Sequence, residues 1–245
     1  MRGILIAGWV LVPVLASAYH YGPGQRQLQL DDVQQQLSKA RAAVAQGDHA
    51  EAVEAFTEAL GKLPADQVEQ TQRVRLERAK ALLHSQQLPK AFDELTALVP
   101  ELQKDDKTNP ELLAEARQAL ANAQYYVTWL ERLEGDSRTE WEPDIEAARQ
   151  TFRLLAEQAE ARGDKAEAKA RQEDLEAAIR LARMDLTDLQ ALPLPSQCKG
   201  CCSGQCQCKG GKGKKKGNGK TPEKKQGDEQ ARGASAGPPP DDGGN

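Results

Sequence analysis

The sequence predicts an all-α protein, and three observations support this prediction. Strands favour β-branched and aromatic side chains, but the body is rich in Ala, Leu, Glu, Gln and Arg, and only 4% of the chain is aromatic. Glycine is costly inside a helix, and residues 28–190 contain only four of the 20 glycines, whereas twelve follow residue 192. Apolar residues in the body recur at helical spacing. We therefore expect a helical domain over 28–190 and a different segment over 193–245.

The first 18 residues have the pattern of a secretory signal. Arg2 gives a positive start, residues 4–15 form an apolar stretch, and an A-x-A cleavage pattern ends at Ala18. This stretch is shorter than the roughly 20 residues that a membrane-spanning helix needs. We expect cleavage and export to the periplasm or the extracellular space. A membrane anchor formed by residues 3–18 is the alternative, because Arg2 is the only charged residue among the first 25.

Turn-forming residues divide the body into seven helical segments. Gly-Asp pairs occur at 47–48, 135–136 and 163–164, and prolines or Asn-Pro separate most of the other segments. The predicted helices are 28–46, 49–62, 66–87, 89–103, 110–134, 143–162 and 164–190.

The helix predicted over 110–134 has two apolar faces. Tyr125 and Trp129 lie four residues apart, roughly opposite a stripe with 3-4-3-4-3 spacing that we expect to be buried. We interpret this segment as a central helix packed on both sides. An exposed aromatic patch for a partner protein is the alternative. The stripe consists of Leu113, Ala116, Leu120, Ala123, Val127 and Leu130.

One turn sequence occurs twice. The run GDHAEA at 47–52 recurs as GDKAEA at 163–168, 116 residues later. Glycine accepts the left-handed end of the first helix, aspartate caps the second, and alanine lets the two axes approach. Such self-similarity is typical of stacked helix pairs.

Around the first of these turns the chain resembles a tetratricopeptide repeat. The residues that carry the resemblance are Gln46 to Val53, Phe56, Ala59, Leu60 and Pro64, and a second copy over 72–103 has Ala79, Leu82, Leu88, Ala91, Leu95 and Leu98 in matching places. Three positions depart from the family pattern: Gln36 and Lys39 replace an aromatic residue and a leucine, and Gln86 replaces the turn glycine. The resemblance covers 28–103, and it extends to 110–190 only in style. It implies an α-solenoid of stacked antiparallel helix pairs. An irregular helical bundle or a partly coiled-coil protein is the alternative.

The resemblance also implies a binding surface. In this family the first helix of each pair lines a concave face that holds a peptide of another protein. Arg41, Arg73 and Lys80 would lie there and could engage a carboxylate, although solvated surface charge is the alternative. The whole set projected onto this face is Gln34, Leu37, Arg41, Val44, Arg73, Leu76, Lys80, Leu83 and His84. Our candidate partner-binding residues are Arg41, Arg73, Lys80, His84, Tyr125 and Trp129.

The residues that enzymes use are scarce in this sequence. The body has no cysteine and no Gly-rich phosphate loop, and the three histidines of the chain are widely spaced, so we interpret each histidine as incidental and expect no enzyme. Residues 19–192 contain 22 basic and 32 acidic residues, which disfavours nucleic acid as a ligand.

The C-terminal segment combines cysteine with lysine. The five cysteines could form disulfides or bind Zn or Cu, and their odd number leaves one sulfur for another molecule, a metal or a reactive thiol. Residues 199–225 contain nine lysines and one glutamate, a flexible polycation that could hold an envelope polymer or lipid head groups. We expect the tail over 193–245 to be disordered. The cysteines are Cys198, Cys201, Cys202, Cys206 and Cys208.

Two hypotheses about function follow from these observations. The first is an exported, non-enzymatic scaffold that binds another protein through the helical array. The second is a metal-binding or thiol-redox protein in which the Cys-rich tail is the working part.

Overall fold

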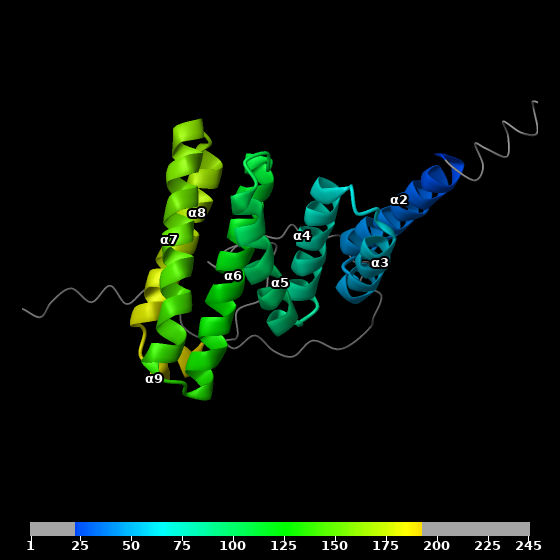
Figure 1. The fold of residues 1–245 in the computed structure, drawn as a ribbon. Coiled ribbons are helices and arrows are strands. Elements are labelled where there is room, and N and C mark those ends of the chain that lie inside the picture. The colour runs from blue at the N-terminus through cyan, green and yellow to red at the C-terminus, as the bar shows by residue number, and fades with distance from the viewer. Residues whose placement is uncertain (1–22, 193–245) are drawn as a thin grey trace, which may run out of the picture. The chain divides into compact units, whose positions relative to one another are not determined.

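The computed structural model describes residues 23–192, which form eight α-helices joined by short turns (Figure 1). Consecutive helices pack as antiparallel pairs, and the described residues contain no strand, so the predicted all-α class with stacked helix pairs is confirmed. The predicted signal sequence, the five tail cysteines and the Lys-rich segment all lie outside the described residues. The helices are α2 (Pro23–Gln46), α3 (His49–Lys62), α4 (Val68–His84), α5 (Leu88–Lys104), α6 (Pro110–Glu134), α7 (Arg138–Arg162), α8 (Lys165–Arg183) and α9 (Leu186–Ala191).

The repeated Gly-Asp sequence builds the same turn twice. Gly47 (φ +84°) and Gly163 (φ +78°) both adopt the left-handed conformation that ends a helix. Asp48 then accepts a hydrogen bond from the backbone N–H of Glu51 at 3.0 Å, and Asp164 accepts bonds from two backbone N–H groups of α8. Each aspartate thus satisfies donors that a helix start leaves free.

Several predicted helix boundaries were wrong. Helix α7 begins at Arg138 and not at residue 143, because Ser137 and Glu140 form a reciprocal capping box ahead of Pro143. Pro143 therefore lies inside the helix, where it lacks the N–H that would bond four residues back.

The predicted helix over 164–190 is also wrong. The chain breaks after Arg183 into α8 and the six-residue α9, although neither glycine nor proline marks the break. At the other end, α2 begins at Pro23 and not at residue 28.

The hydrophobic core consists of two clusters of buried residues that succeed each other along the array of helices. A first cluster joins α2 and α3 to Val74 and Ala81 of α4. A second, larger cluster runs from α4 to α9 and contains fully buried side chains such as Leu95 and Phe152. Each helix packs on the next along the chain, from α2 to α8 (Figure 1).

Helix α6 is packed on more than one side, as the sequence predicted. It contacts α5, α7, α4 and α9. The predicted stripe is only partly right: Ala116 and Ala123 are fully buried, whereas Leu130 is 40% exposed. Because four helices surround α6, its buried residues spread around the helix and do not form a single stripe. The buried apolar residues of α6 are Leu112, Ala116, Ala119, Ala121, Ala123, Tyr125, Tyr126 and Trp129.

Candidate functional site

Helix α4 presents two different surfaces. At about 100° per residue, Arg73 and Lys80 lie on one side of the helix, together with Glu77 and His84. Arg75, Arg78 and Leu82 lie roughly opposite. The first side carries Arg73, Lys80 and His84, which the sequence proposed for partner binding. The leucines projected onto the same binding face were wrongly placed, because they are buried in the core: Leu37, Leu76 and Leu83.

On the first side, every predicted cation is engaged by a carboxylate. Arg41 of α2 makes a two-pronged contact with Glu77, with Nε–Oε2 at 2.9 Å and Nη2–Oε1 at 2.8 Å, and this hydrogen bonding raises the pKa of Arg41. Lys80 forms an ion pair with Glu115 of α6. These pairs connect α2, α4 and α6.

The third cation is held more loosely. The Nη2 of Arg73 lies 3.9 Å from Oε1 of Glu69, one turn earlier in α4. Exposed ion pairs contribute only about 0–1 kcal/mol, so the carboxylate of a partner would displace them at small cost. A role for Arg41, Arg73 and Lys80 in partner binding stays a prediction.

The structure brings together two histidines that the sequence gave no reason to pair. The rings of His49 and His84 stack with centroids 4.8 Å apart and planes 27° apart. Each lies beside a turn at the same end of its helix pair, and both are half-buried. Nearly parallel rings direct their lone pairs side by side and not toward one point. No group of three or more metal-ligating side chains occurs within residues 23–192, so we interpret this stack as a packing contact between α3 and α4.

Tyr125 and Trp129 belong to the core. They are 4% and 6% exposed, and their ring centroids lie 6.0 Å apart. The interpretation of these rings as packed residues therefore holds. The alternative of an exposed aromatic patch is wrong, because a partner could reach neither ring without displacing its neighbours.

A groove opens on the opposite side of α4. Helices α3 and α5 form its walls, α4 forms its base, and it encloses about 560 Å³. Val53 and Leu82 give it an apolar floor, while charged residues from α4 and α5 surround that floor. The lining residues are Val53, Thr57, Arg75, Arg78, Leu82, Gln87, Lys90, Asp93 and Glu94.

The base of this groove is held by a network of charges. The side chain of Glu94 is 9% exposed and accepts two hydrogen bonds from Arg78, one from Nη2 at 2.8 Å and one from Nε at 3.1 Å. Arg75 reaches Glu101 at 2.6 Å, and this hydrogen bond lowers the pKa of Glu101. Arg78 also approaches the hydroxyl of Thr57 on α3 at 3.5 Å. Three consecutive helices are thereby held in one geometry.

The rim of the groove carries charges that are available to a partner. Lys90 is exposed, and its Nζ donates to Oε1 of Gln87 at 2.9 Å. Neither Lys90 nor the exposed Asp93 forms an ion pair with another residue in the described part of the chain. Neither Lys90 nor Asp93 belongs to the set predicted from the sequence, because the family resemblance placed the binding surface on the first helix of each pair.

Acidic residues meet at the turn between α6 and α7. Burial, together with nearby carboxylates of which Asp144 is the first, raises the pKa of Glu131. Burial also raises the pKa of Asp144, which accepts a hydrogen bond from Gln124 at 3.3 Å. Both carboxylates therefore hold a proton more tightly in the folded chain than in water.

Comparisons of the chain with protein-family models, with curated proteins and with solved structures find no match. Within residues 23–192, none of the helices has the length and apolar character needed to cross a membrane.

Proposed function

We propose that the protein is an exported, non-enzymatic scaffold that binds another protein, and that a peptide segment of this partner lies in the groove between α3 and α5. The observation that carries the proposal is the groove itself, which combines an apolar floor with charged groups from three consecutive helices. The tetratricopeptide-like turn and helix stacking support the same class of function.

The charges around the groove favour a polypeptide over a polyanion. Arg75, Arg78 and Lys90 stand beside two carboxylates, Asp93 and Glu94, so the lining has both signs. A phosphate-rich polymer would meet repulsion from both carboxylates, whereas a peptide can offer groups of either sign. Cofactor pockets are concave sites that bury most of their ligand, whereas this groove opens to solvent between two helices.

The apolar floor supplies a place for one side chain of the partner. Leu82 is almost fully buried and Val53 is partly buried at the base of the groove. An apolar side chain placed over them would gain less than the roughly 3 kcal/mol of full burial, because the groove is open on one side. Lys90 and Asp93 on the rim would then orient the polar groups of the same peptide.

Export is part of this proposal because of the sequence at the N-terminus. Residues 1–18 have the charge, apolar length and A-x-A ending of a cleaved secretory signal. Proteinase accessibility in intact host cells, compared with a variant that lacks residues 3–15, tests this part separately from partner binding.

A second candidate function is favoured by the crowding of cysteines. Five cysteines within eleven residues, separated by Gly, Ser, Lys and Gln, could collect Zn or Cu without a folded scaffold. Elemental analysis and thiol counting on protein isolated from its host test this candidate. Stoichiometric metal supports a metal-binding tail, and metal-free protein with oxidised cysteines contradicts it.

The scaffold proposal is tested by changing the two sides of α4 independently. Thr57→Trp on α3 fills the groove, and Asp93→Arg on α5 reverses a charge on its rim while keeping the Lys90 amine, whereas the control Arg73→Glu changes the opposite side of α4. The tagged chains are cross-linked in host cells through lysine amines, and the attached peptides are identified by mass spectrometry.

We expect the partner to be attached through Lys90 and to be lost in both groove variants but retained in Arg73→Glu. Attachment through Lys80, with loss only in Arg73→Glu, would move the binding surface to the face that the sequence predicted. Retention of the partner in all three variants would contradict binding by either side of α4.

A further inference from the structure

The last helix pair of the array has an uncovered side. The first helix pair is followed by α4, which packs on α3, and the second pair is followed by α6, which packs on α5. The last pair consists of α7 and α8, which pack on each other. The next helix, α9, turns back and packs on α6, with Leu189 fully buried (Figure 1). Arg132 of α6 holds this corner by donating to the backbone carbonyls of Leu181 and Met184. Within the described residues, no further helix follows on the outer side of α7 and α8.

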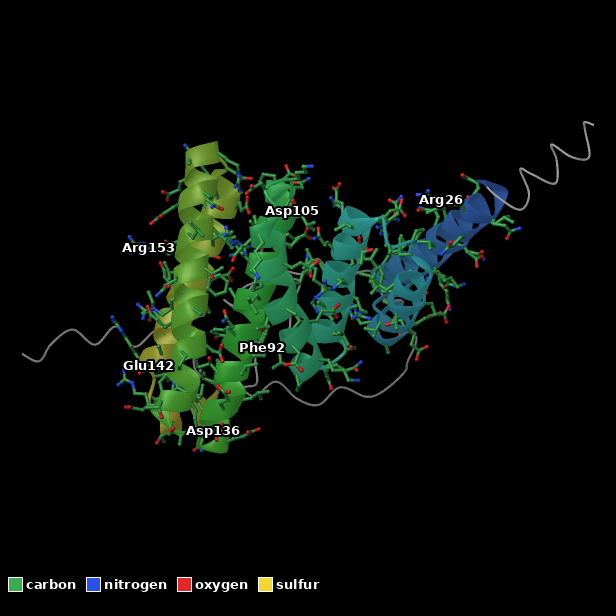
Figure 2. All side chains as sticks on the ribbon, in the orientation of Figure 1. Arg26, Phe92, Asp105, Asp136, Glu142 and Arg153 are labelled. Atoms are coloured by element: carbon green, nitrogen blue, oxygen red, sulfur yellow. The ribbon has the colours of Figure 1, made fainter. Side chains whose placement is uncertain are left out.

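A groove between α7 and α8 lies on this outer side. It encloses about 370 Å³ over an apolar floor of Ala156, Leu175 and Ile179. Asp144 faces α6 through Gln124, and at about 100° per residue Arg153 lies on the opposite side of α7. Figure 2 shows Arg153 pointing away from α6. The charged residues that line the groove are Arg149, Arg153, Glu157 and Glu160.

The order of these charges along α7 is self-complementary. Two arginines come first and two glutamates follow, so the rim has no net charge although the body as a whole is acidic. If a second α7 lies antiparallel to the first, its glutamates fall opposite the arginines. We propose that the groove between α7 and α8 binds the same groove of a second copy of this chain, and that the array forms a twofold-symmetric dimer at this end.

The register of the dimer follows from the symmetry. A twofold axis near residue 155 places Arg153 opposite Glu157 of the second copy and Arg149 opposite Glu160 of the second copy, and the reverse contacts form by symmetry. The two α7–α8 pairs then make a four-helix arrangement that covers Leu175 and Ile179 in both chains.

The existing ion pairs do not oppose this contact. Arg153 meets Glu157 at 2.9 Å and Arg149 meets Glu146 at 2.6 Å, both within α7. The Arg153–Glu157 pair is well exposed, so it holds its side chains weakly and can join a four-charge network across the interface. The remaining acidic charge of each body is screened beyond about 8 Å at physiological salt.

The test uses charge reversal and sedimentation of the full-length chain under reducing conditions, so that cysteine cross-links play no part. Variant A carries Arg149→Glu and Arg153→Glu, and variant B carries Glu157→Arg and Glu160→Arg. The control Arg138→Glu breaks a comparable i, i+4 pair with Glu142 near the start of α7, outside the proposed contact. Circular dichroism establishes that each variant stays helical.

We expect the unchanged chain and the control to dimerise with the same dissociation constant. That constant should rise about tenfold or more in A and in B, because like charges then face each other across the axis. Mixing A with B should restore the dimer as a heterodimer, since each chain now supplies the opposite sign.

Two results would overturn the proposal. One is a chain that stays monomeric at all concentrations, in which case loss of a cross-linked partner in A and B would assign the groove to a helix of another protein. The other is a dimer that neither variant weakens, or that the mixture fails to restore.

Discussion

The first two helix pairs and the later helices are held together by different kinds of contact. Between α2 and α6, ion pairs cross from helix to helix: Arg41 meets Glu77, Arg78 meets Glu94 and Lys80 meets Glu115. In α7 and α8 most ion pairs stay within one helix, as in Arg153–Glu157 and Lys169–Glu173. There the helices contact one another mainly through buried apolar residues and through Arg132. Charge therefore helps to choose neighbours in the first region, and apolar packing does so in the second.

The largest expected effect comes from removing the core of one region. Phe152 and Phe56 are almost fully buried in the two separate clusters. Phe152→Ala should lower the free energy of unfolding by about 3–5 kcal/mol. Hydrogen exchange should show the loss in α6–α8 for Phe152→Ala and in α2–α4 for Phe56→Ala. Equal loss of protection along the whole array in both variants would mean that the two clusters do not define separate regions.

Arg132 provides the next largest effect. Its guanidinium caps the end of α8 and lies 4.8 Å from the ring centroid of Trp141, and burial lowers its pKa. Arg132→Met should cost about 2–4 kcal/mol, because the buried carbonyl of Leu181 and the half-buried carbonyl of Met184 lose their donor. Urea denaturation measures this cost, with the exposed Arg138→Ala as a control that should leave the stability nearly unchanged. A cost no greater than that of the control would show that Arg132 does not hold the corner.

The repeated turn should respond alike in both regions. An added Cβ at Gly47 or Gly163 meets no atom within 4 Å, so only the positive φ opposes a side chain there. Gly47→Ala and Gly163→Ala should each cost about 1–2 kcal/mol. Thermal unfolding measures both costs. A difference of more than about 1 kcal/mol between them would indicate that the surroundings of the turn, and not its backbone alone, decide its stability.

Added salt should lower the stability of the first region more than that of the second, and this effect should be smaller than those above. At about 1 M sodium chloride the Debye length falls to about 3 Å, so salt weakens the attraction within exposed ion pairs such as Arg41–Glu77. Hydrogen-exchange protection should fall more in α2 and α3 than in α7 and α8, and Arg41→Ala should reduce this difference. The same salt response in both regions would contradict the role given to charge.

The smallest expected effect concerns pH at the turn between α6 and α7. Because folding raises the pKa of Glu131 and Asp144, the folded chain binds protons more tightly there than the unfolded chain. Their cost to stability is therefore present above the raised pKa and disappears as the pH falls through it. Glu131→Gln should be slightly more stable than the unchanged chain at neutral pH and equally stable in acid. A constant difference across the pH range would contradict this assignment.

Much of this fold could be predicted because its signals are local. The Gly-Asp turn at 47–48 predicted the end of α2 and the start of α3. Asn109-Pro110 predicted the start of α6, and the Gly-Asp turn at 135–136 predicted its end. The break between α8 and α9 could not be found in this way, because it depends on Arg132, about 50 residues earlier in the chain. The start of α7 was missed because a capping box outweighed the proline that follows it.

The candidate site was less predictable than the helices. Arg41, Arg73 and Lys80 are at least partly exposed on α2 and α4, but the sequence did not show which carboxylates hold them, and their role in partner binding stays a prediction. The stack of His49 on His84 and the groove around Lys90 both depend on how three helices approach one another. Short-range sequence patterns do not determine how separate helices pack, so these features could be found only in the structure.

The most direct test of the account is hydrogen exchange of the chain with and without its cross-linked partner. We expect the partner to increase protection around residues 53–57 and 75–94, which line the groove between α3 and α5. Protection confined to α2 and α6, or no change anywhere in 23–192, would contradict the claim that this groove receives another protein.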